Sequence, residues 1–236
     1  MALALVLLGA GLLATGLGRA DEGAHQHDGD AAEAEHQHQG EAVESMTREH
    51  EHKQLHMKWT AKRPVTEADL ARSERILRAL RASLEKYKDS RLAIEDGFEP
   101  FLPQIPQPHY HFTRKMNGFK AAFRFDPEEP TSLLYKKTAD GYELIGAMYT
   151  AGRWARESKL DARVPLSVAQ WHAHVNICLP KKGTGQYADW TRFGFKGSIA
   201  TEAECDQVRG RWFSQIYGWM LHVYPFETTP EKIWTH

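Results

Sequence analysis

The sequence predicts an α+β fold in which an N-terminal amphipathic helix precedes a mostly antiparallel β-sheet or partly closed barrel, with a short late helix. Apolar side chains recur at helical spacing between Leu70 and Tyr87, with basic residues among them. Prolines between Pro100 and Pro108 then interrupt regular structure, and short runs rich in β-branched and aromatic residues follow. We expect one α+β domain over residues 64–236, a length that suits a single hydrophobic core.

Boundary signals define the expected elements. Helices are predicted over residues 67–88, 90–96 and 201–213. Thr66 with Asp69, and Thr201 with Glu204, match a capping box, and Gly97 suits a helix stop. Strands are predicted over residues 119–125, 132–138, 142–150, part of 164–179, and 217–226, with a hairpin turn at Asp140–Gly141.

Residues 1–17 are apolar and uncharged, and a small-residue stretch ending at Ala20 follows. This pattern predicts a signal peptide over residues 1–20, and therefore a periplasmic or secreted protein with no stable membrane insertion after cleavage. No basic residue precedes the apolar run, and its length is at the short limit for a membrane span. A retained membrane anchor is the alternative.

Residues 21–63 are predicted to be a disordered, acidic, His-rich segment. Residues 21–57 contain ten acidic side chains and two basic ones, Arg48 and Lys53, which gives a net charge of −8. Large apolar residues are scarce, so folding could not offset the loss of chain entropy. Its histidines form a candidate loose metal collector: His25, His27, His36, His38, His50, His52 and His56.

The chain has two cysteines, Cys178 and Cys205. In an exported protein they predict one disulfide, which would stabilise the fold by roughly 3 kcal/mol and join the region after the His-x-His strand to a later helix. Two buried thiols are the alternative if the protein is not exported.

The histidines of the folded part are the candidate ligands of a precise metal site. Around the pair His172 and His174, polar and apolar residues alternate, so both imidazoles share one strand face with Gln170 and Asn176. The opposite face would pack into the core through Ala169, Trp171, Ala173 and Val175. Further ligands are expected from His111, then from His222 and His109. Imidazole ligands suit copper or zinc.

The sequence leaves open which further residues would complete the coordination shell of the metal. The carboxylates considered are Glu95, Asp96, Glu99 and Glu227. The thioethers of Met46 and Met57 favour copper slightly, because sulfur ligands suit Cu(I). Three protein ligands with an open position would indicate catalysis, and four would indicate a structural site.

Three functions follow. The first is an exported copper- or zinc-binding protein with a collecting tail and a His-x-His-based site. The second is a periplasmic metalloenzyme, a hydrolase or an oxygen-using enzyme, with a three-histidine centre. The third is a non-metal binding or scaffold domain.

Phosphate loops, nucleophile elbows and haem-attachment motifs are absent from the sequence. The charge of +6 over residues 58–236 is too small to indicate a nucleic-acid partner. No protein partner is predicted.

Several motifs resemble an uncharacterised family of bacterial exported, periplasmic proteins. They are HYHFT at 109–113, PTSLLY at 130–135, GAMYT at 146–150, WHAHVNIC at 171–178 and GWMLHVYPFE at 218–227. The resemblance covers roughly residues 90–227. It implies an extracytoplasmic setting and carries no activity over to this chain.

Overall fold

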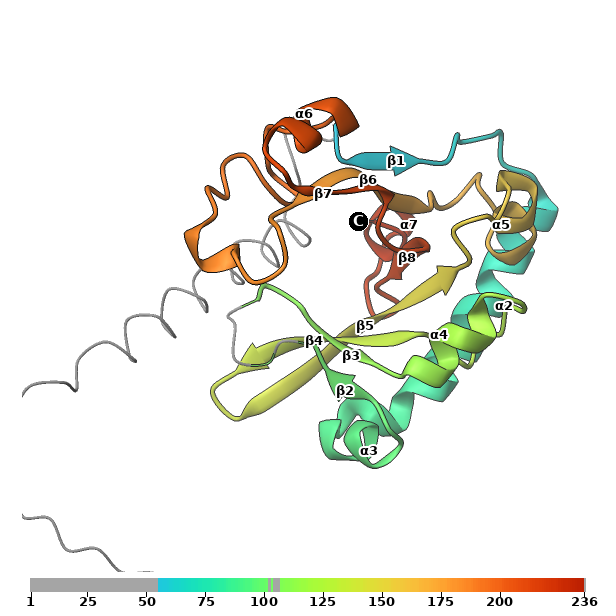
Figure 1. The fold of residues 1–236 in the computed structure, drawn as a ribbon. Helices are drawn as coiled ribbons and strands as arrows, with labels where there is room; N and C mark the ends of the chain where they lie inside the picture. Colours follow the sequence, from blue (N-terminus) through green and yellow to red (C-terminus); the bar gives the residue numbers. More distant parts are fainter. Residues whose placement is uncertain (1–54, 102, 104–106, 236) are drawn as a thin grey trace, which may run out of the picture.

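The structure is a computed structural model that describes residues 55–101, 103 and 107–235. Eight strands form an open sheet of antiparallel ladders in the order β1-β6-β8-β5-β4-β3-β2, and β7 pairs with β6. The strands are β1 (Met57–Trp59), β2 (Glu99–Pro100), β3 (Tyr110–Thr113), β4 (Ser132–Thr138), β5 (Gly141–Ala151), β6 (His172–Leu179), β7 (Arg211–Gln215) and β8 (Trp219–Val223). In Figure 1, β1, β6 and β7 lie at the top, β3, β4 and β5 lie lower, and β8 lies between them. The mixed helix-and-sheet class is confirmed.

The helices and short 3-10 turns flank this sheet. They are α2 (Glu67–Leu84), η1 (Glu85–Lys88), α3 (Ser90–Glu95), α4 (Lys115–Ala121), α5 (Glu157–Arg163), η2 (Gly185–Tyr187), α6 (Glu202–Gln207) and α7 (Pro230–Ile233). The helix expected over residues 67–88 corresponds to α2 and η1, and the Thr66–Asp69 capping box is present. Within the described residues, no helix is both long and apolar enough to cross a membrane.

Two predicted elements were wrong. The strand expected over residues 119–125 is helical at its start, because α4 covers residues 115–121. Phe119 and Phe123 are four residues apart, and their rings meet at 5.5 Å while both remain largely exposed. A short apolar run does not distinguish a strand from a helix by periodicity. The helix expected over residues 201–213 ends at Gln207, and β7 follows.

The large hydrophobic core lies on one face of the sheet. Leu77, Leu80 and Leu84 of α2 are buried there, together with Ala173 of β6 and Trp171, which immediately precedes this strand. The apolar face predicted from the alternation around His172 therefore packs as expected. Since successive side chains of a strand point to opposite faces, the residues between these core positions face away from α2.

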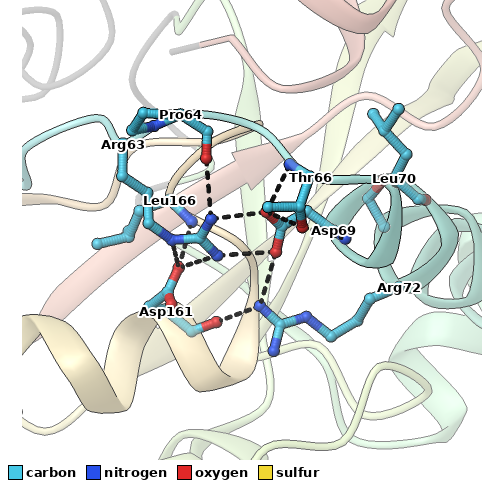
Figure 2. Close-up of polar contacts among 9 residues, drawn as sticks. Arg63, Pro64, Thr66, Asp69, Leu70, Arg72, Asp161 and Leu166 are labelled. Carbon is cyan, nitrogen blue, oxygen red and sulfur yellow. Dashed lines mark hydrogen bonds and ion pairs between the residues drawn. The ribbon is translucent and has the colours of Figure 1, made fainter.

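A polar cluster attaches the start of α2 to α5 (Figure 2). Arg63 donates two hydrogen bonds to the Asp69 carboxylate at 2.6 and 2.7 Å, and a third to Asp161 of α5 at 2.9 Å. Asp161 also accepts the backbone N–H of Leu166 at 2.8 Å. The cluster holds α2 against the C-terminal half of the chain.

Ordered structure is present before Pro64, where the sequence places the start of the domain. Strand β1 (Met57–Trp59) pairs with residues 172–174 of β6. Strand β1 provides hydrogen-bond partners for the backbone groups of β6 at the edge of the sheet. The acidic segment has no apolar pattern from which this strand could have been predicted. The predicted signal peptide and residues 21–54 of the His-rich segment lie outside the described residues.

Candidate metal centre

Four of the five predicted histidines line one cavity of about 500 Å³. His111 comes from β3, His172 and His174 from β6, and His222 from β8. On each strand the neighbours of these histidines, such as Phe112 and Leu221, are buried in the large core. The period of two along a strand therefore places the imidazoles on the other face of the sheet.

The curvature of the sheet brings histidines from separate strands together. Strands β8 and β3 are separated by β5 and β4, a path of about 14 Å at 4.8 Å per strand. Nevertheless, the Nε2 atoms of His111 and His222 lie 3.4 Å apart. Two nitrogens bound to one metal at about 2.0–2.1 Å with a tetrahedral angle are separated by about 3.3 Å. The separation of these two nitrogens matches that of two ligands of one ion.

The imidazoles of β6 continue this row. The ring centroids are 5.5 Å apart for His111 and His222, 5.3 Å for His222 and His172, and 5.8 Å for His172 and His174. His172 and His174 are almost fully buried. The ring of Trp59 lies 5.3 Å from His172, and that of Phe195 lies 4.9 Å from His174. Aromatic packing thus fixes the orientation of the β6 imidazoles.

Burial keeps His111 in its neutral form. Desolvation of its half-buried ring, aided by the nearby His109, lowers the pKa of His111 to about 4. A neutral imidazole has a lone pair available for a metal, whereas an imidazolium has none. At neutral pH, His111 needs no deprotonation before it can coordinate an ion.

The rest of the cavity wall combines hydroxyl, amide and thioether groups with apolar surface. Thr131 and Thr150 share a hydroxyl–hydroxyl hydrogen bond of 2.7 Å. Gln107 donates to the carbonyl oxygen of Phe101 at 2.8 Å. Met148 of β5 and Met220 of β8 also line the cavity. Sequence reasoning missed both methionines, although Met220 precedes His222 by two residues and so shares its strand face.

Other predicted residues lie elsewhere. His109 is not among the described cavity-lining residues, and its Nδ1 lies 3.4 Å from the hydroxyl of Tyr224. Burial lowers the pKa of His109. His56 was assigned to the loose collector, but its side chain is buried. Its ring nitrogens lie 2.9 Å and 2.6 Å from the carbonyl oxygens of Asn176 and Gly197. The remaining six tail histidines lie outside the described residues.

The polar row expected on β6 is shorter than predicted. Asn176 adopts a left-handed backbone conformation with φ of 58°, and its amide donates to the carbonyl oxygen of Leu55. Gln170 donates to the carbonyl oxygen of Thr60 at 2.7 Å. Both side chains therefore hold the segment around β1, and only the two histidines of the row reach the cavity.

The four carboxylates considered as ligands do not line the cavity either. Asp96 binds Lys86 and Tyr87, and Glu99 pairs with Lys115. Glu95 and Glu227 are exposed. No carboxylate occurs among the described residues that line the cavity.

Comparisons of this chain with protein-family models, curated proteins and solved structures find no match. Among residues 55–101, 103 and 107–235, no group of three or more His, Cys, Asp and Glu side chains is already arranged to hold one metal ion. The His111–His222 pair is therefore the best-formed part of the candidate centre.

The predicted disulfide is confirmed. Cys178 of β6 and Cys205 of α6 are bonded, with Cα atoms 5.6 Å apart. The bond joins the late helix, as expected, to the strand that carries His172 and His174 itself rather than to the region after it. It contributes no thiol to the candidate centre.

Proposed function

We propose that this protein is an exported transition-metal-binding protein that binds copper or zinc. The observation that carries the proposal is the 3.4 Å separation of the His111 and His222 Nε2 atoms, in a cavity that His172 and His174 also line. Imidazole nitrogens suit both metals. The disulfide fits an oxidising compartment, and the N-terminal sequence pattern fits export.

In this proposal the two parts of the chain have different tasks. The acidic His-rich segment captures ions loosely and raises their concentration near the folded domain to which it is tethered. The cavity histidines hold one ion in a defined geometry. Removal of the segment should therefore reduce the number of ions bound but leave the tightest site intact.

The test is a calorimetric titration of copper and zinc into protein purified without a His-tag or nickel resin. It compares residues 21–236, residues 55–236, and the longer chain with His111→Ala and His222→Ala. The double substitution should remove the tightest site. The control is His109→Ala, which removes an imidazole two residues from His111 and outside the described cavity lining. If no form binds metal more tightly than a generic His-tagged protein, the proposal is wrong.

A metalloenzyme is the second candidate, favoured by the size of the cavity. A volume of about 500 Å³ leaves room for a small organic molecule beside the imidazoles. This candidate requires an open coordination position on the bound metal. Azide added to the Cu(II)-loaded protein should then change the electron paramagnetic resonance spectrum of the copper. An unchanged spectrum at saturating azide would count against catalysis at this site.

A further inference from the structure

The histidines of the cavity face methionines across the sheet. In the β5–β8 ladder, Met148 is directly opposite His222. In the β6–β8 pairing, Met220 is directly opposite His172. Directly opposed residues of antiparallel strands have Cβ atoms about 4.5–5.5 Å apart and point to the same face. Each thioether therefore shares its face of the sheet with an imidazole.

Both methionines are buried while they line the cavity. They pack with Leu134 in a small apolar cluster that is separate from the large core beneath α2. Leu134 is in turn directly opposite His111 in the β3–β4 ladder. The thioethers, the His111–His222 pair and this apolar patch thus lie on one curved face.

Charge distinguishes the ions that such a site accepts. The described residues lining the cavity include imidazoles, thioethers and hydroxyls, but no carboxylate. Arg153, which also lines the cavity and is itself exposed, adds positive charge. The cost of moving an ion from water into an apolar site rises with the square of its charge. A monovalent ion is therefore favoured over a divalent one.

Ligand chemistry points to the same ion. Thioether sulfur is a soft ligand that selects Cu(I), whereas Zn²⁺ prefers thiolate, imidazole and carboxylate. Two imidazoles and two thioethers give four neutral ligands. The 3.4 Å separation of the His111 and His222 nitrogens fits the tetrahedral angle of such a set.

We propose that the cavity binds Cu(I), with His111 and His222 supplying imidazole nitrogens and Met148 and Met220 supplying thioether sulfurs. This inference rests on the proposed metal-binding function and names the ion and two further ligands. His172 and His174 line the same cavity beside this set.

The test measures Cu(I) affinity of the full mature chain by competition with a chromogenic Cu(I) chelator, in anaerobic buffer with ascorbate. Met148→Leu with Met220→Leu keeps the apolar volume and removes both sulfurs. It should weaken Cu(I) binding by about tenfold or more, which is a loss of about 1.4 kcal/mol or more. Zn²⁺ affinity should be unchanged. The matched control is Met116→Leu, on the exposed face of α4.

X-ray absorption at the copper edge of the unmodified protein gives a second readout that needs no variant. It should show sulfur atoms at about 2.3 Å from the copper. Cu(I) affinity unchanged by the Met148/Met220 substitutions, or a copper spectrum with nitrogen and oxygen scatterers only, would overturn the inference. If His111→Ala with His222→Ala still abolishes binding in that case, the proposed function stands without the thioethers. If the unmodified protein binds neither Cu(I) nor Zn²⁺, both proposals fail.

Discussion

At the residue scale, close approach of backbones positions the candidate ligands. Gly146 of β5 lies opposite Leu134, at a register shift in the β4–β5 ladder. A Cβ atom at Gly146 would overlap the carbonyl oxygen of Val223, the residue after His222. Absence of a side chain at this position lets β8 approach β5, and so helps to place the His222 ring near His111.

Gly146→Ala should therefore lower the free energy of unfolding by about 1–3 kcal/mol, because backbone has to move to accept the added methyl group. Chemical denaturation measures this change. The control is Gly185→Ala, where the nearest atom to the added Cβ, on the Trp190 side chain, is 3.8 Å away. Equal losses for the two variants would contradict the close-approach argument.

At the element scale, the anchoring of α2 depends on charge. The Arg63 guanidinium holds the pKa of Asp69 well below its usual value, chiefly through hydrogen bonds. As the pH falls, the Asp69 carboxyl is therefore protonated at a higher pH in the unfolded chain than in the folded protein. The resulting stabilisation is present above the usual Asp pKa of about 3.9 and is lost as the pH falls towards the folded value.

Asp69→Asn should lower the melting temperature at pH 7, and the difference from the unmodified protein should shrink below about pH 4. Thermal unfolding followed by circular dichroism between pH 2 and 8 tests this. Glu74→Gln removes an acid from the exposed face of the same helix and serves as the control. A difference that stays constant with pH would mean that the charge of Asp69 does not contribute to stability.

At the scale of the whole molecule, the order of the sheet depends on contacts between distant parts of the chain. Strand β1 pairs with β6 more than a hundred residues later, and β8 connects β6 to β5. The disulfide lowers the entropic cost of folding in another way, because it closes a 27-residue loop between β6 and α6 that remains closed in the unfolded chain.

Replacement of both cysteines, Cys178→Ala with Cys205→Ala, should lower the free energy of unfolding by about 3 kcal/mol. Guanidinium denaturation of the oxidised protein, the reduced protein and the variant provides the measurement. Reductant should destabilise the unmodified protein and leave the variant unchanged. Equal midpoints for the oxidised protein and the variant would show that the bond does not stabilise the fold.

The sequence by itself determined the features that depend on neighbours along the chain. The cap at Thr66, the turn at Asp140–Gly141 and the two faces of β6 follow from local geometry, because caps, turns and alternation each involve only a few residues. The Cys178–Cys205 bond followed from composition, since these were the two cysteines of the chain. Local pattern failed at residues 119–125, where a short apolar run suits either a strand or a helix.

Only the tertiary structure decided which histidines meet. His111 and His222 are 111 residues apart in the chain and three strands apart in the sheet, and curvature brings their nitrogens to 3.4 Å. The tertiary structure also placed Met148 opposite His222, and Met220 opposite His172. Strand order, register and curvature arise from the packing of the whole domain, so spacing along one strand could rank the ligands but could not assemble the site.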